Sequence, residues 1–294
     1  MKERQGKRRP AWRKMLWLLL CALAAALFVR WDNTSLQITH WEVPLERLPA
    51  GFDGYRMVVL GDLHTASFGP GNEELLETVR EEDPEVILLA GDLLDCFRGV
   101  PEDYVETVAA GLCAIAPTYY VTGNHEWAIG DVPALKETLA GQGVTVLSNR
   151  FTALERGGDT VVLAGIDDPN GYADQKTPEA LAEEVRAMYG DTFWMLLAHR
   201  NDHFPEQYSL LGADLVISGH GHGGLVRLPF TDGLVSTDRT LFPSYTAGVY
   251  EENGSTLFVT RGLGNSGRTF RLFNRPEVAV VTLRGASAQE ALDG

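Results

Sequence analysis

The chain has 294 residues, 45% of them hydrophobic, which is enough to bury one large core or two modest ones. Its 40 acidic residues outnumber its 25 basic residues, and the formal net charge is -15. A chain this acidic repels polyanions, and its sequence holds no evident basic stripe, so we expect no nucleic-acid partner.

Residues 1–30 combine a basic head with an apolar run. Eight Lys or Arg residues stand there against one Glu, so the remainder of the chain holds 17 basic and 39 acidic residues, a balance of -22. The apolar run, residues 15–29, lies between Trp12 and Trp31, as in a membrane-spanning helix with interfacial aromatic residues. We expect an N-terminal membrane-targeting helix and a single-pass protein of the cell membrane. The positive-inside rule then places the rest of the chain outside the cytoplasm. Cleavage of the run as a signal peptide, followed by secretion, is the alternative.

The rest of the chain, residues 31–294, is predicted to form one α/β domain. Helical stretches are expected at residues 73–82, 102–112, 132–140 and 178–188; in the first, Leu75, Leu76 and Val79 show the spacing of a one-sided face. Strands are expected at residues 36–43, 57–60, 86–90, 118–122, 161–166, 195–198 and 215–218. Further short strands at residues 225–228, 248–250, 257–260 and 278–283 predict an antiparallel finish.

The three cysteines decide little about the compartment. Cys21 lies in the apolar run. Cys96 and Cys113 could pair in an oxidising compartment, although two buried thiols are the simpler expectation.

Polar clusters follow five of the predicted strands and hold five of the seven histidines. The clusters are Asp62-Leu63-His64, Gly91-Asp92-Leu93-Leu94-Asp95, Gly123-Asn124-His125-Glu126, the single His199, and Gly219-His220-Gly221-His222. In open α/β sheets, ligands bind at the carboxyl ends of the strands, so these five segments can converge on one site.

Seven side chains in the clusters have the chemistry of metal ligands: Asp62, His64, Asp92, Asn124, His199, His220 and His222. Carboxylate, amide and imidazole groups without a thiolate suit a divalent ion such as Mn, Fe, Co or Zn. Seven groups are too many for one tetrahedral zinc, and they suit two ions that share a carboxylate. Two such ions can hold a bridging hydroxide and clamp both oxygens of a phosphoryl displacement. Each cluster alone has a plainer explanation, such as a helix-capping Asp or a buried His, but their shared order favours a dinuclear site.

The order of these motifs resembles the calcineurin-like metallophosphoesterase superfamily over about residues 55–225. Gly221-His222-Gly223-Gly224, Arg227-Leu228-Pro229-Phe230 and Arg261-Gly262-Leu263-Gly264-Asn265-Ser266 resemble its membrane-anchored bacterial branch, the YkuE/YaeI-like phosphodiesterases. The resemblance implies the four-layer αββα sandwich of that superfamily. It also implies the ligand sets: Asp62, His64 and His222 for one metal, Asn124, His199 and His220 for the other, and Asp92 for both.

His125 is implied to be catalytic instead of a ligand. It would stabilise or protonate the leaving oxygen, with Asp95 orienting its ring. Either Arg268 or Arg271 could hold a phosphate not bound to metal, or both could be solvated. Glu126 is interpreted as a loop acid beside the site.

Two loops depart from the family pattern, and two histidines are given no role. Arg200-Asn201 stands where the branch often has Asn-Pro, and Thr65 replaces a commonly small residue. His40 and His203 lie outside the clusters. The departures leave every expected ligand in place and put only the details of the substrate in doubt.

The expected function is a metal-dependent phosphoric ester hydrolase, most simply a phosphodiesterase, at the membrane. A metal-bridging hydroxide would be the nucleophile, and the membrane segment favours a lipid-linked or envelope phosphoester as substrate. A soluble-nucleotide phosphodiesterase or nuclease of the same superfamily is one alternative. A non-catalytic metal-binding membrane scaffold is another, disfavoured because no expected ligand is lost.

Overall fold

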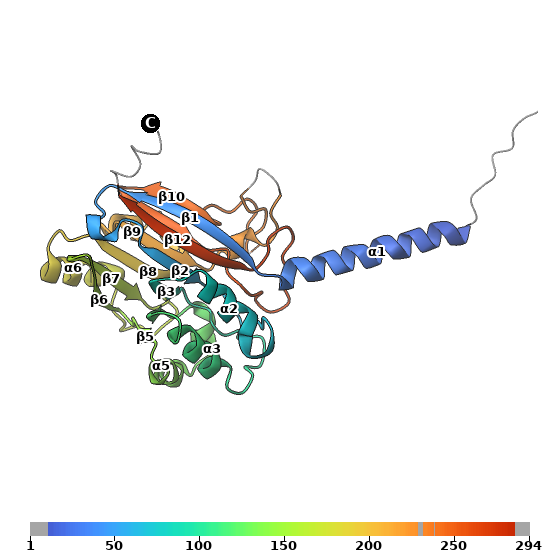
Figure 1. Cartoon of the computed structure of the whole chain (residues 1–294), viewed down its shortest axis with the longest axis horizontal. Coiled ribbons are helices and arrows are strands. Elements are labelled where there is room, and N and C mark those ends of the chain that lie inside the picture. Colours follow the sequence, from blue (N-terminus) through green and yellow to red (C-terminus); the bar gives the residue numbers. More distant parts are fainter. Residues whose placement is uncertain (1–10, 229–231, 238, 286–294) are drawn as a thin grey trace, which may run out of the picture.

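The computed structural model describes residues 11–228, 232–237 and 239–285 (Figure 1). Within these residues, two six-stranded sheets lie face to face with helices on their outer sides. The strand orders are β1-β12-β2-β3-β4-β5 and β10-β11-β9-β8-β7-β6. This arrangement confirms the predicted four-layer αββα sandwich.

The bounds of the elements follow the predicted α/β alternation closely. The first sheet holds β1 (Gln37–Leu45), β2 (Arg56–Leu60), β3 (Val86–Leu89), β4 (Thr118–Tyr120), β5 (Thr145–Val146) and β12 (Glu277–Gly285). The second holds β6 (Arg150–Arg156), β7 (Asp159–Ile166), β8 (Trp194–Arg200), β9 (Leu215–Gly219), β10 (Gly248–Glu252) and β11 (Ser255–Val259). The helices of the body are α2 (Glu73–Glu81), α3 (Tyr104–Cys113), α4 (Asn124–Ile129), α5 (Val132–Gly141) and α6 (Pro178–Tyr189). Short 3-10 helices are η1 (Ala50–Phe52), η2 (Pro70–Asn72), η3 (Asn201–His203), η4 (Tyr208–Leu210) and η5 (His222–Gly224).

Three apolar clusters hold the four layers together. Between the sheets lie alternate residues of the central strands, such as Val59 of β2 and Ile217 of β9. The neighbouring residue Val58 points the other way and packs under α2, α3 and α5, because successive side chains of a strand face opposite sides. Helix α6 covers the outer face of the second sheet with Leu181 and Val185. Strands buried on both faces explain the continuous apolar runs in the sequence.

The C-terminal part differs from the prediction. Strands β10 and β11 form an antiparallel pair as expected, but β11 is parallel to β9, and β12 lies between a parallel β1 and an antiparallel β2. The strand predicted at residues 225–228 is wrong, since Leu225 and Val226 make only isolated bridges. Gly223, Gly224 and Leu225 all have positive φ values, which curl the chain out of an extended conformation.

Helix α1 (Ala11–Thr34) is long and apolar enough to cross a membrane. It continues past residue 30, where the sequence suggested the end of the segment, and its last turn joins the body. The Asn33 side chain donates to the Arg271 carbonyl at 2.9 Å and accepts from the Arg271 N–H at 2.7 Å. Only Ser35 and Leu36 separate α1 from β1. The helix therefore enters the body without a loose linker.

Candidate metal centre

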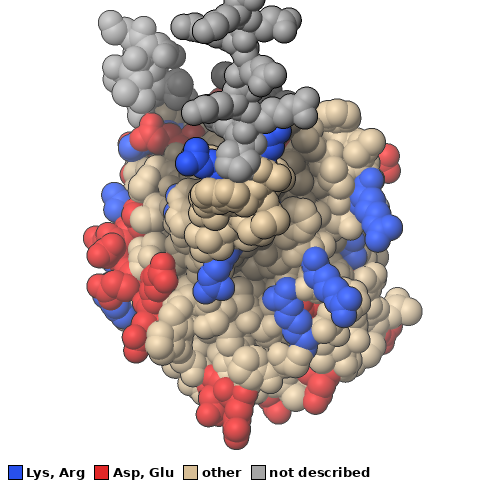
Figure 2. Space-filling model, turned by 90° about the vertical axis from the view of Figure 1, so that its right-hand side faces the viewer, with Lys and Arg blue, Asp and Glu red and all other residues tan. Residues whose placement is uncertain are grey.

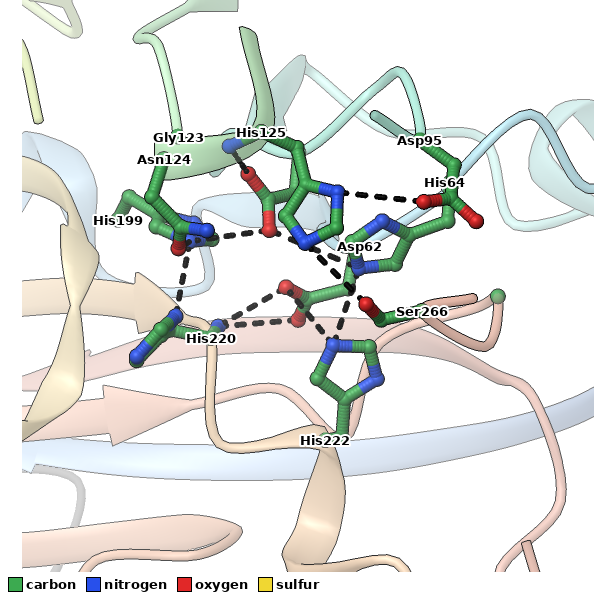
Figure 3. Close-up of polar contacts among 12 residues, drawn as sticks. Asp62, His64, Asp95, Gly123, Asn124, His125, His199, His220, His222 and Ser266 are labelled. Carbon is green, nitrogen blue, oxygen red and sulfur yellow. Dashed lines mark hydrogen bonds and ion pairs between the residues drawn. The ribbon is translucent and has the colours of Figure 1, made fainter. Parts of the chain in front are cut away.

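The five polar clusters meet at the carboxyl edges of the two sheets. Asp62, Asp92 and Asn124 follow the adjacent parallel strands β2, β3 and β4 of the first sheet. His199 lies near the end of β8, and His220 follows β9, its parallel neighbour in the second sheet. Figure 3 shows the side chains of Asp62, Asn124, His199 and His220 pointing toward one another.

One group consists of Asp62, His64 and His222, all buried, with potential ligand atoms within 4.8 Å of one another. The Nε2 atoms of His64 and His222 lie 3.0 Å apart, and His222 Nε2 lies 3.6 Å from an Asp62 oxygen. Both carboxylate oxygens of Asp62 accept the His220 N–H, at 3.0 and 3.1 Å, which fixes its orientation. Two imidazole nitrogens and a carboxylate facing one point make a donor set that fits a divalent ion.

A second group consists of Asp92, His199 and His220. His199 Nε2 lies 3.1 Å from His220 Nδ1 and 3.2 Å from the Asn124 side-chain oxygen. The Asp92 Oδ2 atom lies 3.4 Å from His199 Nε2 and 3.6 Å from His64 Nε2. One oxygen of Asp92 therefore lies between the two groups. A ligand shared by two ions would have to lie in such a position.

The backbone of the centre adopts conformations that L-residues rarely take. Asp62, His64, Asp92, His220 and His222 have φ values between 47° and 65°. Left-handed conformations of non-glycine residues are uncommon and cost energy, and they cluster at functional sites. Close packing adds to this, because a Cβ on Gly123 would lie 2.2 Å from an Asp92 oxygen. The loops are thus shaped to aim these side chains inward.

Burial favours the neutral form of three of the four histidines in the two groups. It lowers the pKa of His64 to about 4, against the opposing effect of Asp92. Burial also places the pKa values of His220 and His222 well below their ordinary value. Burial alone would lower the pKa of His199 as well, but the Asp92 carboxylate overrides it and raises the pKa to about 10. Neutral imidazoles with free lone pairs are the form that binds metal.

His125 lies beside the first group and is buried. Its Nδ1 atom is 3.3 Å from an Asp95 oxygen, and its ring packs edge-on against His64 at 4.4 Å between centroids. Nε2 of His125 is 3.2 Å from the hydroxyl of Ser266 (Figure 3). Sequence reasoning gave Ser266 no role, although it placed this residue in the Gly-Leu-Gly-Asn-Ser turn.

Glu126 is not the loop acid that the sequence suggested. It is buried and accepts hydrogen bonds from the backbone N–H groups of Asp92 and Leu94 at 3.0 Å and of Gly123 at 2.6 Å. It thereby binds the Asp92 loop to the start of α4. The bond from Gly123 to a Glu three residues later is half of a helix capping box, a pattern visible in the sequence.

Arg200 and Asp168 form a pair that the sequence analysis missed. The Arg200 guanidinium donates to buried Asp168 at 2.7 Å, and its Nη1 atom lies 3.1 Å from His220 Nε2. Arg200 lines a cavity of about 440 Å³ next to the second group, together with Asn201, Ser236, Thr240, Tyr245 and others. The departure at Arg200 thus places a cation beside the centre.

The remaining residues of interest lie elsewhere or act differently. Arg271 is fully buried and donates to the carbonyls of Gly264 and Arg261 at 2.7 Å. Neither position that the sequence left open for Arg271, in solvent or on a phosphate, agrees with this burial. Arg268 is exposed. His40 pairs with Glu82 at 2.8 Å on the outer edge of the first sheet. His203 is the last residue of η3, and its Nδ1 atom lies 3.3 Å from the Gln207 side-chain oxygen. Cys21, Cys96 and Cys113 are all free.

The family model for calcineurin-like phosphoesterases matches residues 55–224, more than half of the chain. The chain belongs to this family. It is therefore a metallophosphoesterase, a hydrolase of phosphoric esters, with clustered Asp and His residues able to hold metal ions.

Curated relatives agree with the family. The chain is 31% identical over 262 residues to a "transmembrane protein with metallophosphoesterase domain" of Danio rerio, covering 83% of this chain and 56% of that protein. It thus spans little more than half the length of this relative. It is 26% identical to metallophosphoesterase YkuE of Bacillus subtilis, covering 86% and 87% of the two chains. It is 29% identical to phosphodiesterase YaeI of Escherichia coli, covering 78% and 82%.

Proposed function

We propose that the protein is a membrane-anchored phosphodiesterase that works with two divalent metal ions. The position of Asp92 is the observation that supports this most strongly, because one of its oxygens faces both histidine groups at 3.4 and 3.6 Å. Asp62, His64 and His222 would hold the first ion, and Asn124, His199 and His220 the second, with Asp92 shared. Mn, Fe, Co and Zn all suit these donors.

Two divalent ions held by these residues would neutralise phosphate charge and activate the attacking water. The protein's own contribution to the leaving group is His125. Its Nδ1 faces Asp95 at 3.3 Å, which orients the ring, and its Nε2 faces the site beside Ser266. A proton on Nε2 is then placed to stabilise the leaving oxygen.

The substrate that we propose is a lipid-linked or envelope phosphoester. Helix α1 would anchor the protein in the cell membrane, with the basic N-terminus in the cytoplasm and the phosphoesterase body outside. The cavity beside the second group has room for a substituent of the phosphate, and Arg200 supplies a cation to it. We include no nucleic acid among the substrates, because the body beyond residue 30 carries the surplus of acidic residues.

The test is a substrate panel on the purified full-length protein loaded in turn with each of the four metals. We expect bis-p-nitrophenyl phosphate to be hydrolysed at least about tenfold faster than p-nitrophenyl phosphate, which would identify a diesterase. Phospholipid in mixed micelles should release a phosphorylated head group. Rapid turnover of soluble cyclic nucleotides or single-stranded DNA, without lipid turnover, would favour the nucleotide alternative. No hydrolysis with any metal would favour the scaffold alternative.

A further inference from the structure

Exposed aromatic side chains gather at the end of the body from which α1 leaves. Four phenylalanines are exposed among the described residues: Phe97, Phe242, Phe270 and Phe273. Phe97 lies on the loop after β3, and Phe270 and Phe273 lie on the loop between β11 and β12. These two loops touch, because Arg98 donates to the carbonyl of Gly267 and the Gly267 N–H donates to Asp95 at 2.9 Å.

The loop of residues 266–273 leads from the candidate centre to the helix. At its start, the Ser266 hydroxyl lies 3.2 Å from His125, and the Phe97 ring stands edge-on to the same histidine at 5.6 Å. At its end, the Phe273 ring contacts Phe28 of α1 at 5.4 Å. The rim of the centre and the base of the helix are therefore parts of one surface. Figure 1 shows these C-terminal loops beside the base of α1.

The contact between Phe273 and Phe28 relates the position of Phe273 to the depth of α1 in a bilayer. Phe28 is the last residue but one of the apolar run, which ends at Val29. In a helix that spans a bilayer, this position lies at the boundary between hydrocarbon and head groups, where aromatic residues are favoured. Phe273 packs against Phe28 and so lies at the same level. Trp31, one turn further along, is covered by the Arg275 guanidinium at 4.7 Å.

The charge on this face also suits a membrane surface. Viewed down α1, Figure 2 shows mostly uncharged atoms around the helix, with Lys and Arg side chains nearby and most Asp and Glu side chains toward the edges. The remainder of the chain after residue 30 carries a balance of -22, so this face differs from the average of the body. Scattered basic residues with exposed aromatic ones are the composition of surfaces that bind anionic bilayers.

We propose that this end of the body, with Phe97, Phe270 and Phe273 around the base of α1, is a membrane-contact face that rests on the bilayer. The phenylalanines enter the head-group region, and the rim of the centre at His125 and Ser266 is held at the surface. Phosphoester head groups then reach the centre without leaving the membrane. The substrate part of this inference rests on the proposed function, whereas the contact itself rests only on α1 as an anchor.

Depth can be measured without any assay of activity. The full-length protein with Cys21, Cys96 and Cys113 changed to Ser receives one new cysteine, Phe270→Cys, labelled with the fluorophore NBD. It is placed in nanodiscs of phosphatidylcholine and phosphatidylglycerol with or without doxyl-labelled lipid. We expect doxyl lipid to quench the label at least about twofold, as for a group in the head-group region. Met188→Cys is the matched control, since Met188 is 68% exposed on α6 at the opposite end of the body, and its label should not respond. Equal, weak quenching at both positions would overturn the membrane-contact face.

A second measurement separates the face from the chemistry. Phe270→Glu should lower turnover of phospholipid in vesicles by about tenfold, because a carboxylate opposes insertion, and leave turnover of bis-p-nitrophenyl phosphate unchanged. Met188→Glu should change neither. An inactive wild-type protein with a quenched label at position 270 would contradict the proposed function and leave the face intact. Equal lipid turnover by wild type and Phe270→Glu would contradict delivery of substrate through the face.

Discussion

The Nε2 atoms of His64 and His222 face each other at 3.0 Å, although 158 residues separate them in the chain. His64 follows β2 of the first sheet, and His222 follows β9 of the second. Burial lowers the pKa of both rings, to about 4 for His64, so two neutral lone pairs converge. An ion held between them would connect the two halves of the sandwich.

Metal removal should therefore destabilise the whole protein. A ligand that binds only the folded state adds stability by mass action, and at a concentration 100 times its dissociation constant this amounts to about 2.7 kcal/mol. We expect the melting temperature to fall by several degrees after chelation and to recover when the metal is restored, as followed by differential scanning calorimetry. His222→Ala, which lacks a ligand of the first group only, should show a smaller difference, and a wild-type melting temperature that does not respond to chelator would contradict the metal centre.

Replacing Asp92 by Asn should remove metal. The bridging position needs a carboxylate, because a neutral amide neutralises neither ion and offers one oxygen instead of two. We expect the purified variant to retain fewer than two ions per chain by elemental analysis, and to lose turnover. Asp214→Asn is a control at a partly buried carboxylate far from the centre that pairs with Arg47. Two ions retained in Asp92→Asn would exclude the bridge.

His125→Ala should affect chemistry without affecting metal content. A group that protonates a leaving oxygen is worth about 10²–10⁴ in rate, so turnover should fall by at least about a hundredfold. Asp95→Asn should have a smaller effect, about tenfold, because His125 remains but loses the carboxylate that orients it. His203→Ala, outside the centre, serves as the control. Unchanged turnover in His125→Ala would remove this role.

Metal binding should release protons and strengthen as pH rises. The Asp92 carboxylate raises the pKa of His199 to about 10, so near pH 7 the metal-free ring is protonated and must lose that proton to bind an ion. The sign for stability is opposite. Since this pKa lies above the unfolded value of about 6.5, the His199–Asp92 pair stabilises the metal-free fold fully below pH 6.5 and loses that effect as pH approaches 10. Titration calorimetry in PIPES and in Tris measures the protons released, and identical heats in both buffers would contradict the prediction.

Glu126→Gln should cost stability through the loop that carries Asp92. The amide keeps one acceptor oxygen and turns an NH₂ group toward backbone donors, leaving a buried N–H without its partner. Such a loss costs about 1–3 kcal/mol, or a few degrees in melting temperature for a protein of this size. Glu106→Gln, on the exposed side of α3, should melt like the wild type. Equal melting temperatures for the two variants would show that the hydrogen bonds accepted by Glu126 add little to the stability of the protein.

Most of the fold was predictable because the pattern was simple. Strands β2, β3, β8 and β9 are buried on both faces and appear as unbroken apolar runs, and helices such as α2 have a clear one-sided spacing. Strand β6 was not predicted, since only Leu154 of its seven residues is buried and the others show no regular alternation. The curl at residues 223–225 was missed because φ values there depend on packing with distant segments.

The residue types of the candidate site could be predicted from the sequence, but the residues that contact and orient them could not. Asp, Asn and His residues that follow strands point to the centre on their own. Other features of the site depend on contacts between segments far apart in the chain. They are the burial of Arg271 and Glu126, the Arg200–Asp168 pair and the contact of Ser266 with His125. Nothing local in the sequence signals such contacts, except the capping pattern at Gly123 and Glu126.

The junction between α1 and β1 limits where this enzyme can work. Only two residues lie between α1 and β1, and Asn33 of α1 is hydrogen-bonded to Arg271 of the body. The body therefore has no flexible linker at this junction that would let the centre move away from the end of the helix. With α1 in a bilayer, as we propose, encounters with substrate would be set by lateral diffusion in two dimensions, and the relevant substrate concentration would be a surface density. A change in the density of substrate in the membrane would then alter the rate even at a constant amount of substrate per cell.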